Sequence, residues 1–312
     1  MIGIVDDALR MWRMQGAEIT FIAARENRVY RVEHAGRQYA LRLHRQGYRS
    51  DAELRSELDW MAAVARGGLV VPAPFPSDSG ALLHVIQGVQ VDMLSWLPGR
   101  PLGDMGHVPD RPGLFRALGR DMARLHEVSD AWPRPDGFVR CNWDRAGLLG
   151  EAPLWDRFWE NPDLSDQDRT LFETLRKDAD ATLKHLENDL DYGLIHADLV
   201  VTNVMTDGTQ VAFIDFDDGG FGFRLFELAT ALLRQMSEPD YAALRDALIG
   251  GYRSVRAIDT TPLDLFLVLR AMTYVGWNIT RMDEDGGKAR NARFISTART
   301  LAETYLREVG GR

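Results

Sequence analysis

The stretch that decides the fold of this chain is residues 194–217, Leu-Ile-His-Ala-Asp-Leu-Val-Val-Thr-Asn-Val-Met-Thr-Asp-Gly-Thr-Gln-Val-Ala-Phe-Ile-Asp-Phe-Asp. It places His196, Asp198 and Asn203 in one short loop, and it places Asp215 at the end of an apolar run. One carboxylate in such a loop can accept the proton of a hydroxyl group. An amide oxygen and a second carboxylate are ligands that Mg²⁺ prefers. The spacing therefore indicates a proton acceptor together with a magnesium site.

Local patterns explain how the two expected metal ligands meet. A short apolar strand, Tyr192–Ile195, is predicted to lead into the loop. Two more strands are predicted around a tight turn at Asp207-Gly208, namely Asn203–Thr206 and Thr209–Ile214. Such a hairpin brings Asn203, at its start, back beside Asp215, at its end. A Greek-key-like hairpin with exposed polar ends is the alternative, but it requires four residue types to coincide at four fixed positions.

The arrangement H-x-D-x-x-x-x-N, followed by I-D-F-D, resembles the aminoglycoside phosphotransferase and choline kinase superfamily, whose motif reads H-G-D-x-x-x-x-N and then I-D-F/W-[DE]. The resemblance is nearest to the bacterial branch that contains type II homoserine kinase and the RdoA-like kinases. It runs over most of the chain and includes four further segments: Glu26–Val32, Tyr39–His44, Ser95–Gly99 and Met122–His126. The motif is specific for the superfamily, and no segment is specific for one substrate.

The resemblance implies an α+β fold of the bilobal protein-kinase type, with a small antiparallel-sheet lobe and a larger, mainly helical lobe. We place the nucleotide-binding lobe at residues 1–95, the hinge at 96–101, and the catalytic and substrate-binding lobe at 102–312. Alternation and turn signals agree with a sheet in the first part. The predicted elements there are strands Asn27–Glu33 and Gln38–His44, a helix Asp51–Arg66 capped by Ser50 or Asp51, and a hairpin of Leu82–Ile86 with Val89–Leu94.

Beyond the hinge the chain is expected to be mostly helical. Leu114–Val128 has apolar residues at helical spacing. Three further helices are predicted to begin at capping boxes, in which Ser165, Ser237 and Thr261 are each followed three residues later by Asp. The glycine-rich segment Gly219–Gly222 is expected to form a flexible loop.

Composition excludes several classes of protein. With 312 residues, 45% hydrophobic and 27% charged, the chain is an ordinary globular sequence. It has no apolar run near the roughly 20 residues that span a bilayer, and its first residues do not read as a signal peptide. Its single cysteine, Cys141, excludes an internal disulfide and a multi-cysteine zinc site, so a cytoplasmic location is expected. The net charge of −9 argues against a nucleic-acid partner, and the oligomeric state is not encoded in any pattern.

The resemblance carries roles over to individual residues. Asp198 matches the catalytic base, and Asn203 and Asp215 match the Mg²⁺ ligands. His196 matches the histidine that braces the catalytic loop. In an extended strand Asp217 would share a face with Asp215, so it either reaches a second metal or the acceptor, or it is a solvated loop carboxylate.

The expected nucleotide site departs from protein kinases at Arg42, where they have a lysine. The three lysines of the chain lie far downstream, at Lys177, Lys184 and Lys288. Arg42 itself is therefore predicted to contact the phosphates, unless it is a surface strand residue. Glu57 is favoured over Glu53 as its ion-pair partner. The other predicted nucleotide contacts are Asn27 in the covering segment 23–27, Ala40 against the base, and Met93 and Ser95 at the hinge.

The acceptor side is expected to be walled by aromatic residues of the helical lobe. Trp143, Trp155 and Trp277, with Asp217, suit an amine-bearing alcohol through cation–π contacts, although for any single tryptophan a place in the helix core is the favoured interpretation. Glu227 stands where the family has Asp, and it could brace the catalytic loop with a longer reach.

Together these features imply an ATP- and Mg²⁺-dependent kinase of a small hydroxylated molecule, such as an amino alcohol, a hydroxy amino acid or an aminoglycoside. Two alternatives remain. The RdoA resemblance allows a serine/threonine protein kinase. The departures at Arg42 and Glu227 allow a nucleotide-binding pseudokinase. The intact Asp198, Asn203 and Asp215 argue against the pseudokinase.

Overall fold

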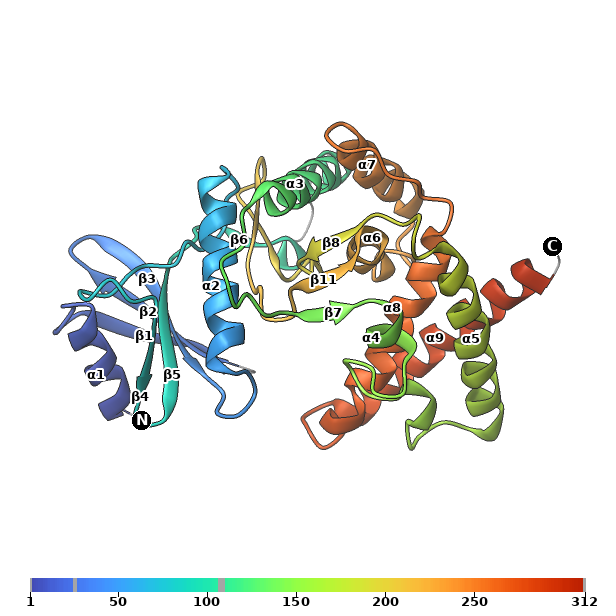
Figure 1. Cartoon of the computed structure of the whole chain (residues 1–312), viewed down its shortest axis with the longest axis horizontal. Helices are drawn as coiled ribbons and strands as arrows, with labels where there is room; N and C mark the ends of the chain where they lie inside the picture. Colours follow the sequence, from blue (N-terminus) through green and yellow to red (C-terminus); the bar gives the residue numbers. More distant parts are fainter. Residues whose placement is uncertain (1, 25–26, 106–109, 311–312) are drawn as a thin grey trace. The chain divides into compact units, whose positions relative to one another are not determined.

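A computed structural model describes residues 2–24, 27–105 and 110–310 of the chain (Figure 1). The chain divides into two compact units, each discontinuous in the sequence. The first comprises residues 1–107, 127–140 and 202–217, and the second comprises 108–126, 141–201 and 218–312. Each unit therefore combines segments that are far apart in the sequence.

The first unit contains a five-stranded antiparallel sheet in the order β1-β2-β3-β5-β4. Its strands are β1 Glu18–Ala24, β2 Asn27–His34, β3 Arg37–His44, β4 Leu83–Ile86 and β5 Val89–Ser95. Strands β2 to β5 confirm the sequence prediction. The turn after β4 has positive φ at Gln87 (51°) and Gly88 (78°), as a two-residue type I′ turn requires. Edge strand β1 escapes sequence prediction because a bulge between Phe21 and Ala23 breaks its alternation.

Two helices of this unit pack on the sheet. Helix α1 (Ile2–Met11), which is not predicted from the sequence, contributes to a core with the residues Val5, Ala8, Leu9, Val32, Leu41 and Met93. Helix α2 (Asp51–Arg66) has the predicted bounds, and Ser50 is its cap. The Ser50 hydroxyl accepts the N–H of Glu53, and the Glu53 carboxylate accepts the N–H of Ser50. Side chains alternate along β3, so Arg42 and Leu41 point to opposite faces of the sheet. Because Arg42 pairs with Glu57 of α2, this helix lies on the face opposite to Leu41.

A second sheet of the first unit carries the decisive hairpin. It has the order β10-β9-β6, with β6 Arg100–Pro101, β9 Val204–Thr206 and β10 Val211–Phe213. A hairpin at this position is thus confirmed, but its loop has the four residues 207–210 and its second strand begins at Val211, not at Thr209. The Asp207 carboxylate accepts the N–H groups of Thr209 and Gln210 within this loop. The segment expected to be a hinge ends in β6, which pairs with β9, and η1 (Leu102–Asp104) follows it.

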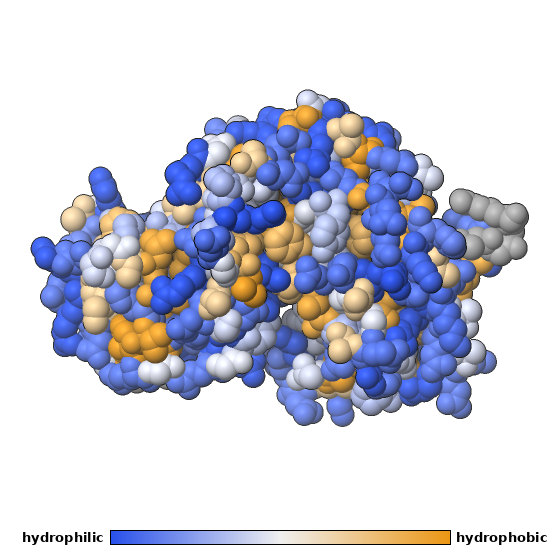
Figure 2. Space-filling view, viewed as in Figure 1, coloured by the Kyte–Doolittle hydropathy of each residue, from blue (hydrophilic) through white to orange (hydrophobic). Residues whose placement is uncertain are grey.

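The second unit is mainly helical. Its helices are most of α3 (Arg111–Ala131), α4 Arg145–Leu149, η2 Phe158–Glu160, α5 Asp166–Leu186, α6 Arg224–Leu233, α7 Tyr241–Arg253, α8 Leu263–Trp277, η3 Ile279–Arg281 and α9 Gly287–Gly310. Helix α8 packs against both α6 and α9. Across the described part of the chain, no helix has the length and apolar character to cross a membrane. Hydrophilic residues cover most of the face of each unit seen in Figure 2.

The expectation of a flexible loop at Gly219–Gly222 is wrong. Residues Gly220–Phe223 form strand β11, the centre of a three-stranded sheet between β7 (Cys141–Trp143) and β8 (Tyr192–Ile195). A Cβ atom on Gly222 would lie 2.5 Å from Ile195 Cδ1 and 2.8 Å from Trp143 Cβ. These glycines therefore allow close approach of strands that are distant in the sequence, which local turn signals do not reveal.

Of the three predicted helix caps, one is confirmed. Ser165 caps α5, and its hydroxyl accepts the N–H of Asp168 at 3.1 Å. The other two predictions are wrong, because α7 begins after Asp240 and α8 begins after Pro262, neither of which makes a side-chain cap. The Thr261 hydroxyl instead donates to Asp259, in a local turn that competes with capping.

Candidate active site

The loop that carries His196 and Asp198 follows β8 and is anchored by α6. The Glu227 carboxylate accepts the N–H of His196 at 2.9 Å and the N–H of Ala197 at 2.6 Å. Ala197 has a φ of 64°, in the left-handed region, at the position where the superfamily motif has glycine. The two hydrogen bonds to Glu227 thus hold a backbone conformation that alanine rarely adopts.

Glu227 and the predicted bracing histidine are both buried. The Nδ1 atom of His196 accepts the N–H of Asp198 at 3.4 Å, which agrees with a bracing role inside the loop. Burial raises the pKa of Glu227 to about 7, although the backbone hydrogen bonds oppose this change. His126 lies 3.4 Å from Glu227, and burial lowers the pKa of its imidazole. The longer side chain of Glu227 therefore reaches the loop that the family's Asp would brace.

Replacing Glu227 tests this anchor. Glu227→Ala leaves two buried N–H groups without an acceptor, and it is expected to lower the free energy of unfolding by about 1–3 kcal/mol. Glu227→Gln keeps one acceptor oxygen, so its loss is expected to be smaller. Urea unfolding at neutral pH measures both variants. A Glu227→Ala variant as stable as the wild type would contradict the anchoring role.

The carboxylate of Asp198 is held by an arginine that the sequence motif does not reveal. Arg270 Nη2 donates to Asp198 Oδ1 at 2.7 Å. Arg270 is fully buried, whereas 23% of the Asp198 side chain remains exposed. Burial raises the pKa of Asp198 to about 6, and Arg270 acts in the opposite direction. Asp198 thus combines access to solvent with one oxygen fixed by a buried cation.

The three tryptophans predicted to line an acceptor pocket have different surroundings. Trp143 is almost fully buried (1% exposed) and stacks on Phe226, with ring centroids 5.2 Å apart. It therefore belongs to the core, which was the favoured interpretation for any single tryptophan. The other two tryptophans are partly exposed, and each ring lies against an arginine. The guanidinium carbon of Arg270 is 4.6 Å from the ring centroid of Trp155, and that of Arg281 is 4.3 Å from the ring centroid of Trp277.

Asn203 and Asp215 lie at the two ends of the β9–β10 hairpin in the first unit. The N–H of Ile214 donates to the carbonyl of Asn203 at 3.0 Å, which brings the chain beside Asn203 just before Asp215. An amide oxygen and a carboxylate fit a hard cation such as Mg²⁺. Within residues 2–24, 27–105 and 110–310, no three His, Cys, Asp or Glu side chains converge as a metal site. A cation at this hairpin would therefore need further oxygens, as nucleotide phosphates supply.

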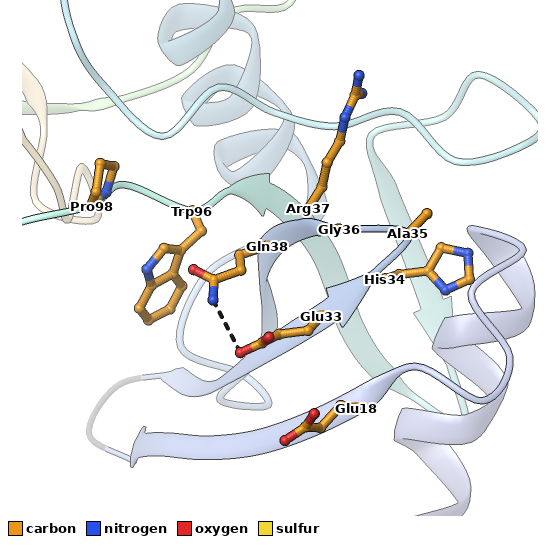
Figure 3. Close-up of a pocket in the computed structure, with 9 residues that line it drawn as sticks. All are labelled: Glu18, Glu33, His34, Ala35, Gly36, Arg37, Gln38, Trp96 and Pro98. Carbon is orange, nitrogen blue, oxygen red and sulfur yellow. Dashed lines mark hydrogen bonds between the residues drawn. The ribbon is translucent and has the colours of Figure 1, made fainter.

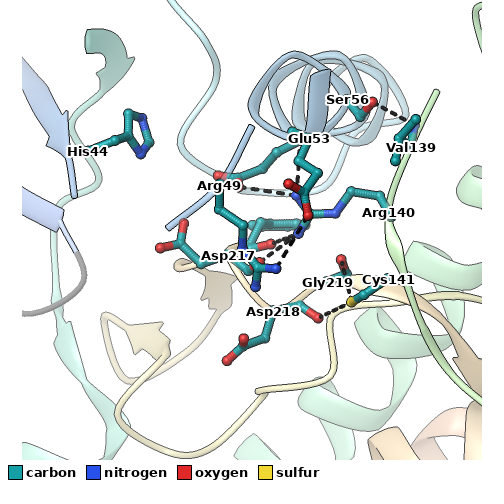
Figure 4. Close-up of polar contacts among 12 residues, drawn as sticks. His44, Arg49, Glu53, Ser56, Val139, Arg140, Cys141, Asp217, Asp218 and Gly219 are labelled. Atoms are coloured by element: carbon teal, nitrogen blue, oxygen red, sulfur yellow. Dashed lines mark hydrogen bonds and ion pairs between the residues drawn. The ribbon is translucent and has the colours of Figure 1, made fainter. Parts of the chain in front are cut away.

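Asp217 is tied into the first unit by both its side chain and its backbone. Its Oδ2 accepts Asn27 Nδ2 at 2.6 Å, and its Oδ1 lies 3.5 Å from Arg42 Nη1. Its carbonyl accepts Arg49 Nη2 at 3.1 Å and Arg140 Nη2 at 2.7 Å (Figure 4). The expectation that Asp217 shares a strand face with Asp215 is wrong, because β10 ends at Phe213 and Asp215 has a φ of 70°.

Arg42 is buried and surrounded by carboxylates, so it is not a surface strand residue. Its Nε and Nη2 donate to the two oxygens of Asp92 at 2.8 and 2.7 Å, and its Nη1 donates to Glu57 at 2.9 Å. The preference for Glu57 over Glu53 is confirmed, since Glu53 instead completes the cap of α2. Although burial opposes it, Arg42 and His44 lower the pKa of Asp92.

Two members of this buried network are missing from the sequence predictions. Asp92 stands between the buried residues Val91 and Met93 of β5 and pairs in register with Arg42 of β3. Once β3 and β5 are paired, Asp92 and Arg42 lie on the same face of the sheet, so their ion pair could have been predicted from the strand pairing. Arg140 Nη1 lies 3.4 Å from Glu57 and its Nη2 donates to the carbonyl of Phe216 at 2.8 Å. No periodic pattern marks Arg140, because it lies outside helices and strands.

The residues expected at the hinge have main-chain partners within the first unit. The carbonyl of Met93 accepts the N–H of Phe75 at 2.7 Å, and the N–H of Ser95 donates to Ala73 at 2.8 Å. Ala40, expected to lie against the base, is half-buried and pairs with Leu94. In the covering segment 23–27, residues 25 and 26 lie outside the described residues.

A hollow of about 500 Å³ lies on the first unit, at the β2–β3 turn (Figure 3). Glu18, Glu33 and Trp96 line it, and Gln38 donates to Glu33 at 3.1 Å. None of the residues predicted for catalysis or metal binding is among its lining residues. This hollow is therefore separate from the groups described above.

Comparison with known proteins finds a phosphotransferase family and individual kinases that match this chain. Residues 18–266 match the family described as the phosphotransferase enzyme family. A homoserine kinase of Agrobacterium fabrum is 28% identical over 231 residues, which cover 72% of this chain and 67% of that protein. The structure of a microcompartment-associated aminopropanol kinase is 29% identical, with a TM-score of 0.87, and the match covers 100% of this chain and 99% of that chain.

A more distant structure shares the fold. An amicoumacin kinase in complex with AMP-PNP, Ca²⁺ and Ami is 21% identical, with a TM-score of 0.80, and the match covers 97% of this chain and 93% of that chain. These similarities confirm the superfamily resemblance and the predicted α+β, kinase-like fold with its antiparallel N-terminal sheet.

Proposed function

The chain belongs to the phosphotransferase enzyme family and is a kinase that acts on a hydroxyl group, and on this basis we propose that it transfers the γ-phosphate of ATP, with Mg²⁺, to a small molecule. The acceptor class is an amino alcohol, a hydroxy amino acid or an aminoglycoside. The observation that carries the proposal is the carboxylate of Asp198, which is partly exposed, fixed by a buried arginine and placed on a loop pinned by Glu227.

Each group has a distinct task in this proposal. Asp198 orients the acceptor hydroxyl and takes its proton as the bond to phosphorus forms. Asn203 and Asp215 would hold Mg²⁺, which would neutralise charge on the phosphates. Arg42, whose side chain is held in place by hydrogen bonds to Asp92 and Glu57, supplies a fixed positive charge for the nucleotide. His196 and Glu227 act through the backbone of the loop and do not touch the substrate.

Two named activities among the relatives support a small acceptor. The aminopropanol kinase and the homoserine kinase are 29% and 28% identical to this chain, and both matches cover more than two thirds of it. The substrates named for both of these proteins are small molecules. A small hydroxylated acceptor is therefore favoured over a protein serine or threonine.

The acceptor class can be found by transfer of labelled γ-phosphate from ATP with Mg²⁺. The panel should contain aminopropanol, homoserine, choline, an aminoglycoside and a generic protein substrate. Labelling of one small-molecule class by the wild type is the expected result. Labelling of the protein substrate alone would favour the protein-kinase alternative, and ATP binding without any transfer would contradict the proposed function.

The pH dependence of the reaction provides a further prediction. The pKa of Asp198 is raised to about 6, and the base must be ionised to accept a proton. The value of kcat/KM is therefore expected to be highest above pH 6 and to fall as pH decreases through about 6. A pH–rate profile of the wild type measures this limb. A flat profile from pH 5 to 8 would contradict the assignment of Asp198 as the base.

A further inference from the structure

Helix α8 is almost entirely apolar and buried, yet it carries Arg270 with no exposed surface. Taking a guanidinium ion out of water is unfavourable unless an anion and other polar or aromatic groups surround it. The sequence around it, Leu-Val-Leu-Arg-Ala-Met, has no other charged residue. The partners of Arg270 in the second unit therefore indicate the role of this charge.

Those partners are of two kinds. Nη2 of Arg270 donates to Asp198 Oδ1 at 2.7 Å and to the Tyr274 hydroxyl at 3.1 Å. The guanidinium carbon lies 4.6 Å from the ring centroid of Trp155, 4.5 Å from that of Tyr274 and 5.3 Å from that of Phe226. These three rings form an aromatic box around the cation. Nε and Nη1 have no hydrogen-bond acceptor among the described residues. The aromatic rings stabilise the buried cation in place of such acceptors.

This geometry restricts both partners. A guanidinium packed among three rings cannot swing with a mobile side chain, so the position of its Nη2 is fixed. A charge-assisted hydrogen bond from a fixed donor then sets the rotation of the Asp198 carboxylate. The loop backbone is held by a second contact, because Glu227 accepts two of its N–H groups. Arg270 thus acts on the side-chain orientation of the base.

We propose that Arg270 is a positioning residue for Asp198, and that it fills the aromatic box of Trp155, Phe226 and Tyr274 with a cation of the chain itself. An ammonium group of the acceptor is then bound elsewhere, which changes the role expected for Trp155 from the sequence. This inference rests on the proposed function, since it concerns the base of that reaction.

The test compares kinetics of Arg270→Ala with the wild type and with a matched control. Misplacement of the base is expected to lower kcat by about 10²-fold with KM for ATP unchanged. Added guanidinium ion, at concentrations too low to unfold the protein, is expected to restore part of kcat, whereas urea, which is planar but uncharged, is not. Arg299→Met is the control, because Arg299 is an exposed arginine of the same unit that pairs with Asp168 at 2.9 Å. Its kcat is expected to equal that of the wild type.

Each outcome distinguishes this inference from the proposed function. A wild type that transfers no phosphate overturns both. If the wild type is active and folded Arg270→Ala has unchanged kcat, only the positioning role is overturned. The same holds if Arg270→Ala loses no more kcat than Arg299→Met, or if guanidinium does not restore the kcat that Arg270→Ala loses. If Arg270→Ala does not fold, Arg270→Lys carries the test, since it keeps the charge but not the planar fit in the box. Wild-type kcat in that variant overturns the inference.

Discussion

Replacement of Asp198 by asparagine is expected to lower kcat by about 10²–10⁴-fold. Asparagine keeps an oxygen that can accept the Arg270 hydrogen bond, which is 2.7 Å long in the wild type, but it cannot take a proton. The residues assigned to the nucleotide and the metal are unchanged, so the affinity for ATP is expected to stay the same. Steady-state kinetics with the acceptor found in the panel, together with calorimetric ATP binding, measure the two quantities separately.

Asp166→Asn is the matched control for this change, since it removes an exposed carboxylate at the start of α5. Its kcat is expected to equal that of the wild type. A folded Asp198→Asn variant with wild-type turnover would show that another group takes the proton.

Arg42→Met is expected to cause the largest loss of stability, about 3–5 kcal/mol, because removing one partner of a buried ion pair leaves an uncompensated charge. Both Asp92 and Glu57 are fully buried and pair with Arg42 at 2.7 and 2.9 Å. Methionine fills similar volume but neutralises neither carboxylate. Urea unfolding measures the loss, and ATP binding is expected to disappear in the same variant.

Arg13→Met provides the contrast within the same unit. Arg13 pairs with Asp78 at 2.6 Å, but the two side chains are 75% and 47% exposed. Loss of such a surface pair is expected to cost at most about 1 kcal/mol. The double variant Arg42→Met, Asp92→Asn is expected to lose less than the sum of its single variants, because one unpaired charge is removed. Equal losses in Arg42→Met and Arg13→Met would show that the buried network does not stabilise the fold.

Much of the local structure follows from patterns that lie within a few residues. The hairpin that carries Asn203 and Asp215 could be predicted because its Asp-Gly turn and its apolar strands are contiguous. Helix α2 could be predicted with its bounds, since the Ser50 cap and the apolar spacing act over one or two turns. The pairing of Glu57 with Arg42 followed from the family pattern and not from any local signal.

Features set by long-range packing could not be predicted in this way. Strand β11 looks like a glycine loop until its neighbours, Trp143 and Ile195, are placed beside it. Arg270 looks like a surface arginine on an apolar helix, and only the packed second unit brings Asp198 and three aromatic rings to it. Asp92 is likewise explained by its register with Arg42 across two strands. In each case, the partner is chosen by tertiary structure.

The most direct test of the central claim is observation of the new phosphate ester by phosphorus NMR. Wild-type protein and Asp198→Asn would each be incubated with ATP, Mg²⁺ and the acceptor found in the panel, with and without a chelator. The account predicts a phosphomonoester signal and an equal amount of ADP for the wild type with Mg²⁺, and neither for the variant or the chelated sample. An ester signal of equal size from Asp198→Asn, or ADP formed with phosphate released to water instead of the acceptor, would contradict it.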